Sequence, residues 1–142
     1  MKPVLLALTL ATLGAIIYHL GQKTVPATAN PMLVLMGAYA LAFSLSAMAM
    51  PFFRATGTLP WVSQVISWPV AMVGVGALLI EIGFLLAYRS GGSLQWSGVA
   101  VNGVAALILF PIAVGVFREA FSWGRAMGVL CVLVGLALLA RR

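Results

Sequence analysis

Long apolar runs separated by short polar turns constrain this chain more than any other feature. A helix needs about 20 mostly apolar residues to cross the hydrocarbon core of a bilayer, and the chain contains five such runs. Only 7% of its 142 residues are charged, against about 25% in a soluble domain. So few charges do not coat a water-facing surface. The sequence therefore predicts an integral membrane protein.

The five runs predict an all-α fold, an integral membrane bundle of five transmembrane helices that forms a single membrane domain over residues 1–142. Turn residues separate the runs, such as the prolines of "QKTVPATANP" and the paired glycines of "RSGGS". The predicted spans cover approximately residues 3–20, 31–50, 61–88, 94–117 and 123–140. The first run also resembles a signal peptide cleaved after Ala29, but His19 and Lys23 favour a retained span.

Two prolines fall inside predicted spans. Pro69 lies eight residues into the third one and removes a backbone hydrogen bond. Either this span kinks there, or "WVSQVIS" lies partly in the membrane interface and the span proper starts near Pro69. Pro111 likewise frees the carbonyl of Leu107 in the fourth span. Freed carbonyls are tolerated where protein or a water cavity satisfies them, so each proline marks either a functional bend or a packing kink.

The basic residues predict no single orientation in the membrane. The net charge is +6, but the basic residues stand singly or in pairs between apolar runs, which is typical of membrane flanks and not of a nucleic-acid surface. With five spans, one face would hold Lys2, Arg54, Arg118 and Arg125, and the other Lys23, Arg89, Arg141 and Arg142. This balance removes the positive-inside bias. We therefore expect dual topology and an antiparallel homodimer, as in inverted repeats; the alternative is one orientation set by one or two loops.

Glu81 lies inside the apolar run "GALLIEIGFLLAYR" and is one of only two acidic residues. An ionised carboxylate near the bilayer centre costs about 2.5–3.5 kcal/mol, so Glu81 must pair with a cation, face water or take up a proton. A group that binds either a proton or a cation can couple their movements. The alternative is a structural anchor tied to His19, Lys23 or Tyr39.

Counting residues inward from the span ends brings polar groups of other helices near the depth of Glu81. The predicted substrate-lining residues are Tyr18, Tyr39, Trp68 and Asn102, and His19 is a possible partner of Glu81. Structural roles stay open for three of these residues. His19 is then an interfacial residue, Asn102 forms a hydrogen bond between helices, and Trp68 serves packing alone. No acid pair, metal-ligand cluster or phosphate-binding loop is recognisable, so we expect no enzyme activity, no metal and no cofactor.

The C-terminal third contains a series of short motifs whose order is similar to that of a known protein family. A proline-containing span, "LFPIAVGVF", leads to Glu119, a polar turn "AFSWGR", and a last span with Gly128 and Gly135 a heptad apart. This order resembles the end of an EamA-like repeat of the drug/metabolite transporter superfamily, and "GFLLAYR" is similar to the third span of that repeat. The resemblance implies half of a ten-helix inverted-repeat transporter, acting as a small-molecule exporter or exchanger of the cell inner (plasma) membrane.

The chain departs from the family pattern in two ways. Pro111 lies closer to Glu119 than is usual, and there is one repeat where most members hold two of opposite orientation. The related small multidrug resistance proteins carry their essential Glu on the first span, where this chain has no acid. That residue is therefore not transferable, and Glu81 is the candidate for coupling.

These observations predict a transporter that moves a small organic solute by alternating access, as an antiparallel homodimer in the lipid bilayer, with Glu81 exchanging a proton for substrate. Two alternatives to this transporter remain open. One is a non-transporting membrane subunit, and the other is a half-transporter that needs a different partner chain of opposite orientation.

Overall fold

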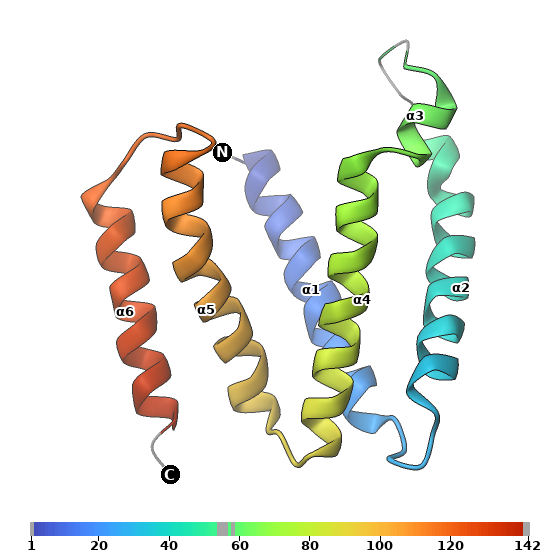
Figure 1. Ribbon diagram of the computed structural model, residues 1–142, viewed down its shortest axis with the longest axis horizontal. Coiled ribbons are helices and arrows are strands. Elements are labelled where there is room, and N and C mark those ends of the chain that lie inside the picture. Colours follow the sequence, from blue (N-terminus) through green and yellow to red (C-terminus); the bar gives the residue numbers. More distant parts are fainter. Residues whose placement is uncertain (1, 54–56, 58, 141–142) are drawn as a thin grey trace. The chain divides into compact units, whose positions relative to one another are not determined.

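The computed structural model describes residues 2–53, 57 and 59–140, and the regular structure in this range is helical (Figure 1). The helices are α1 (Lys2–Thr24), α2 (Pro31–Ala49), the 3-10 turn η1 (Met50–Phe52), α3 (Trp61–Val65), α4 (Trp68–Arg89), α5 (Leu94–Gly115) and α6 (Trp123–Ala140). They form two compact units. Unit 1 combines Met1–Lys23 with Ser90–Arg142, and unit 2 is Thr24–Arg89. The all-α prediction is confirmed.

Within the described residues, four helical segments are long and apolar enough to cross a membrane. They are Pro3–Thr24, Pro31–Phe52, Trp61–Arg89 and Leu94–Gly115. The apolar helix Trp123–Leu139 is shorter. By length and composition the chain is a membrane protein with these four candidate spans. The fifth span, and a single membrane domain over residues 1–142, stay predictions.

The helix starts follow the turn chemistry of the sequence. The Asn30 side chain accepts a hydrogen bond from the Met32 backbone N–H (2.9 Å), and Pro31 occupies the first turn of α2, where a backbone N–H has no helical partner. Ser93 caps α5 in the same way by accepting from the Trp96 N–H (3.2 Å). These two caps fix where α2 and α5 begin.

The helical path is interrupted just before Pro69. α3 ends at Val65, Ile66 is extended (φ −112°, ψ 92°), and α4 begins at Trp68 with Pro69 in its first turn. A proline in a first turn lacks only a donor that the helix does not use. Of the two arrangements open from the sequence, a continuous helix kinked at Pro69 is therefore not adopted. α5, in contrast, continues through Pro111 to Gly115.

Unit 1 is organised around the antiparallel pair α5 and α6, which lie side by side in Figure 1. Gly103 of α5 is buried where α6 presents Leu136 and Val132. A Cβ atom placed on Gly103 would lie 2.4 Å from Leu136 Cδ1 and 3.1 Å from Val132 Cγ1. The absence of a side chain at Gly103 is therefore what allows this close approach.

Unit 2 contains α2 and α4, which contact each other. Leu35 of α2 and Leu85 of α4 are 2% and 0% exposed, and the rings of Phe84 and Tyr88 stack with centroids 6.0 Å apart. At the end of α4, Arg89 Nη2 donates to the Ala29 carbonyl (2.7 Å). This bond ties the end of α4 to the turn before α2.

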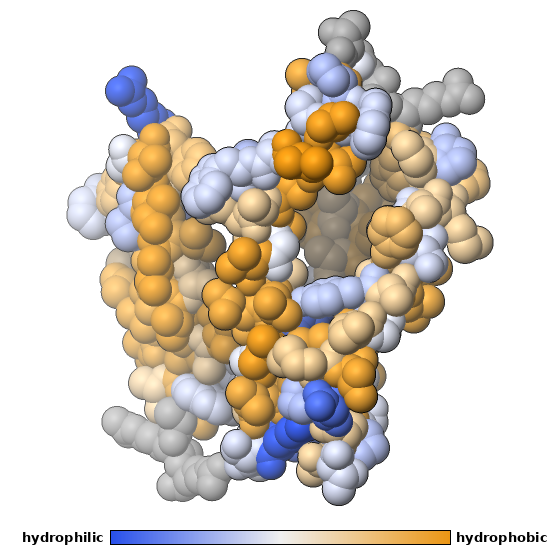
Figure 2. Space-filling model, turned by 45° about the vertical axis from the view of Figure 1, so that its right-hand side comes forward, coloured by the Kyte–Doolittle hydropathy of each residue, from blue (hydrophilic) through white to orange (hydrophobic). Residues whose placement is uncertain are grey.

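Most large apolar side chains of the described helices are exposed. Leu6, Phe43 and Val73 are more than 70% exposed, although each lies within a candidate span. Figure 2 shows hydrophobic residues over the helix sides, with most of the strongly hydrophilic residues toward the helix ends. Contiguous apolar surface of this kind suits lipid or a protein partner and not water.

Candidate functional site

Glu81 lies in the middle of the apolar helix α4. It follows the helix start at Trp68 by 13 residues and precedes Arg89 by eight, which is about 12 Å of helix. Its side chain is half-buried, and the fully buried Leu85 lies one turn further along α4. The acidic side chain is therefore held away from both ends of its helix, as the sequence indicated.

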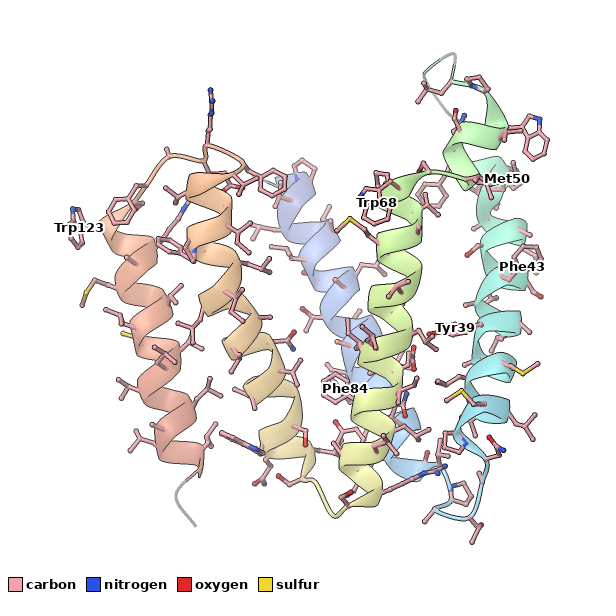
Figure 3. All side chains as sticks on the ribbon, viewed as in Figure 1. Tyr39, Phe43, Met50, Trp68, Phe84 and Trp123 are labelled. Carbon is pink, nitrogen blue, oxygen red and sulfur yellow. The ribbon has the colours of Figure 1, made fainter. Side chains whose placement is uncertain are left out.

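Tyr39 is the neighbour of Glu81 in unit 2. Its side chain extends from α2 toward α4 in Figure 3, and its hydroxyl is close enough to the Glu81 carboxylate to feel its charge. The hydroxyl oxygen is buried and forms no hydrogen bond with any described residue. A phenol both donates and accepts, so Tyr39 provides an uncommitted donor near an acidic group.

Three further predicted residues lie in unit 1. The rings of Tyr18 and His19 meet edge to face at 5.1 Å, and the Tyr18 hydroxyl accepts from Gln22 Nε2 (3.4 Å). Asn102 of α5 donates from Nδ2 to the Gly98 carbonyl one turn earlier (2.9 Å). The partnership of His19 with Glu81 joins residues of different units and stays a prediction.

An open groove of about 610 Å³ runs between α1 and α5 in unit 1. His19 and Asn102 both line it, together with small residues such as Ala15 and Gly98. We call it the α1–α5 groove. The structure thus brings together two of the residues that the sequence singled out, and adds small residues that the sequence did not single out.

Trp68, predicted as a lining residue, is the first residue of α4 and is 77% exposed. It borders a shallow depression on α4 with Met72 and Val75. Figure 3 shows its indole at the start of this helix, whereas Glu81 lies about 20 Å of helix further on. Trp68 and Glu81 are therefore separate features of α4.

Glu119 contrasts with Glu81. It lies beyond α5, where its Oε2 is 3.8 Å from Arg125 Nη1, and both side chains are more than half exposed. An exposed pair of this kind contributes at most about 1 kcal/mol. Among the described residues, no three His, Cys, Asp or Glu side chains are placed to hold a metal ion.

Comparison with known proteins gives no match, whether to a family model, to a curated protein or to a solved structure. The class of protein therefore rests on the length and composition of its helices. Within the part of the chain that the structure describes, they define a membrane protein with four candidate transmembrane helices and an additional shorter apolar helix.

Proposed function

We propose that this chain is a small-molecule transporter of the inner (plasma) membrane, in which Glu81 takes up and releases a proton in each cycle. The observation that carries the proposal is the half-buried Glu81 in the centre of an apolar helix. An ionised carboxylate near the bilayer centre costs at least about 2.5–3.5 kcal/mol. A side chain retained at that cost is a functional candidate by default.

The surroundings of Glu81 support a change of protonation. The Tyr39 hydroxyl lies within the field of the carboxylate and is not committed to another described residue. It can donate to the ionised form and accept from the protonated form. The neighbour therefore serves both states, which a coupling residue requires.

The proposed assembly is an antiparallel homodimer, in which each chain supplies half of the ten-helix arrangement that the EamA-like resemblance implies. Two observations support it: the balance of basic residues between the two predicted faces, and the exposed apolar helix faces, which a partner would cover. Alternating access then follows from rocking of the two copies around a shared path, as with inverted repeats.

The orientation is tested by tags placed in the loop after Lys23 and in the loop that contains Arg54. Dual topology predicts that each tag is reached from both sides of the membrane in a population of cells. Access to each tag from one side only would contradict the homodimer. It would favour a half-transporter with a different partner chain, which the same exposed faces would also suit.

The coupling is tested in liposomes that contain a pH-sensitive dye. A panel of neutral, cationic and anionic organic solutes is added outside, and proton movement is recorded for the wild-type protein, Glu81→Gln and Glu119→Gln. Glu119→Gln is a matched control because it removes the other acidic residue of the chain. We expect solute-driven proton movement that only Glu81→Gln abolishes. Equal movement in Glu81→Gln, or none in the wild type with any solute, would contradict the proposal.

A further inference from the structure

The α1–α5 groove has a defined shape along its two helices. The residues that shape it are Thr12, Ala15 and His19 from α1 and Gly98, Asn102 and Ala106 from α5. The His19 ring reaches α5, because a Cβ on Gly98 would lie 3.1 Å from His19 Nε2. The chain runs in opposite directions in the two helices, so Asn102 faces the level of Ala15, and Ala106 that of Thr12.

A few lining residues of this groove have groups that can hydrogen-bond a ligand. Asn102 uses one N–H to bond Gly98, which leaves its second N–H and its carbonyl able to bond a ligand. The Thr12 hydroxyl donates to the Leu8 carbonyl (2.8 Å) and its oxygen can still accept. The His19 imidazole also lines the groove, and the other lining residues are apolar or glycine. The groove therefore offers a mainly apolar surface with hydrogen-bonding groups at a few positions, among them Asn102 and Thr12.

No carboxylate, ammonium or guanidinium group lines the groove among the described residues. A cationic ligand there would lose its hydration without gaining a counter-charge. A neutral ligand avoids this penalty. The one ionisable side chain of the described lining, the His19 imidazole, both donates and accepts hydrogen bonds in its neutral form and then suits an uncharged ligand. The groove is therefore matched in charge to an uncharged molecule, whatever the charge preference near Glu81.

The dimensions favour a small molecule over a transmembrane helix. The lining covers about 12 Å of α1, from Thr12 to Leu20, and about 18 Å of α5, from Leu94 to Ala106. A spanning helix would lie along about 30 Å. The volume of about 610 Å³ lies within the range of about 300–1,000 Å³ that is typical of ligand sites.

We propose that the α1–α5 groove binds a neutral, amphipathic small molecule, with its apolar body against Ala15 and Ala106 and a hydrogen-bonding head at Asn102. The statement that a transported solute binds here rests on the proposed function. The statement that a ligand binds here depends only on the observations made in unit 1.

The test is photolabelling of the full chain in lipid nanodiscs with three probes of one skeleton. para-Hydroxymethylbenzophenone is neutral with a hydroxyl head, benzophenone lacks the head, and para-benzoylbenzyltrimethylammonium is cationic. Mass spectrometry locates the labelled peptides. The groove predicts that the hydroxyl probe labels α1 and α5 most strongly, benzophenone less and the cation least.

Variants make the assignment specific. Ala15→Phe fills the groove and is expected to abolish labelling, whereas Ala7→Phe, on the opposite face of α1, should leave it unchanged. Asn102→Leu should reduce labelling by the hydroxyl probe about fivefold, the factor that one net hydrogen bond contributes to binding. Labelling by benzophenone should stay unchanged. Size-exclusion profiles and thermal unfolding curves confirm that each variant is folded.

The outcomes separate the site from the transport proposal. The site is contradicted if the cation labels as well as the hydroxyl probe, if Ala7→Phe and Ala15→Phe act alike, or if native mass spectrometry finds a bound phospholipid that Ala15→Phe removes. Labelling as expected without solute-driven proton movement would retain the site and overturn the transporter. Glu81-dependent proton movement without labelling would do the reverse.

Discussion

The imidazole of His19 lies directly against Gly98, so that a methyl group at Gly98 would be 3.1 Å from His19 Nε2. This contact joins α1 to α5, and both residues line the α1–α5 groove. It explains why a glycine is placed there in a helix that would otherwise favour alanine.

Gly98→Ala is therefore expected to displace the His19 ring by a few tenths of an ångström. His19 is the only histidine of the chain, so nuclear magnetic resonance of protein with labelled histidine gives one set of ring signals. Those signals should move in Gly98→Ala. Gly115→Ala is the matched control on α5, because a Cβ there meets nothing within 4 Å. Equal shifts in both variants would contradict the contact.

Gly103 sets the spacing of α5 and α6. An added Cβ would lie 2.4 Å from the end of the Leu136 side chain, and overpacking of this kind costs about 1–3 kcal/mol. We expect Gly103→Ala to lower the midpoint of thermal unfolding in detergent, and Gly128→Ala, which has open space around it, to leave it unchanged.

The same contact predicts non-additivity. Leu136→Ala alone leaves a cavity, but it also makes room for a methyl group at position 103. The double variant should therefore be more stable than the sum of the two single effects implies. Strict additivity would show that the two residues do not touch.

Tyr39 separates a structural from a functional role. Because its buried hydroxyl bonds no described residue, Tyr39→Phe should leave the unfolding midpoint unchanged or slightly raised. The proton movement driven by solute should nevertheless fall, since Glu81 loses its neighbouring donor. A large loss of stability with unchanged proton movement would reverse the assignment.

A neutral ligand has an electrical consequence. If one uncharged solute leaves for each proton that enters, every cycle carries one net positive charge. A membrane potential of about 100 mV contributes about 2.3 kcal/mol per elementary charge, so an inside-negative potential should drive solute exit. Proteoliposomes with an imposed potassium gradient and valinomycin measure this. Exchange that is insensitive to the potential would contradict a neutral cargo.

The sequence and the structure agree where local chemistry decides. The turn segments "QKTVPATANP" and "RSGGS" are predicted to separate helices. α2 begins at the last residue of the first segment and α5 directly after the second, with Asn30 and Ser93 accepting hydrogen bonds from nearby backbone N–H groups. The outcome at Pro69 was open between two arrangements, because the choice depends on whether Ile66 and Ser67 stay helical. The structure ends α3 at Val65, so Pro69 falls in a first turn.

The site was predictable only in part. Asn102 and Glu81 stand out because polar groups are rare in apolar helices. Gly98 and Gly103 do not, since a small residue in a membrane helix acquires meaning only when another helix approaches it. Their close contacts with His19 and Leu136 are tertiary facts. Five residues turn an α-helix by about 140°, so the two glycines lie on different faces of α5 and no single stripe of small residues marks them.

The central claim is that the Glu81 carboxyl group changes its protonation when solute binds. Infrared difference spectroscopy of the protein in lipid, before and after addition of a solute that drives proton movement, observes the carboxylic-acid carbonyl directly. We predict a solute-induced band in the wild type and in Glu119→Gln that is missing in Glu81→Gln. A band that persists in Glu81→Gln, or none in the wild type, would contradict the account.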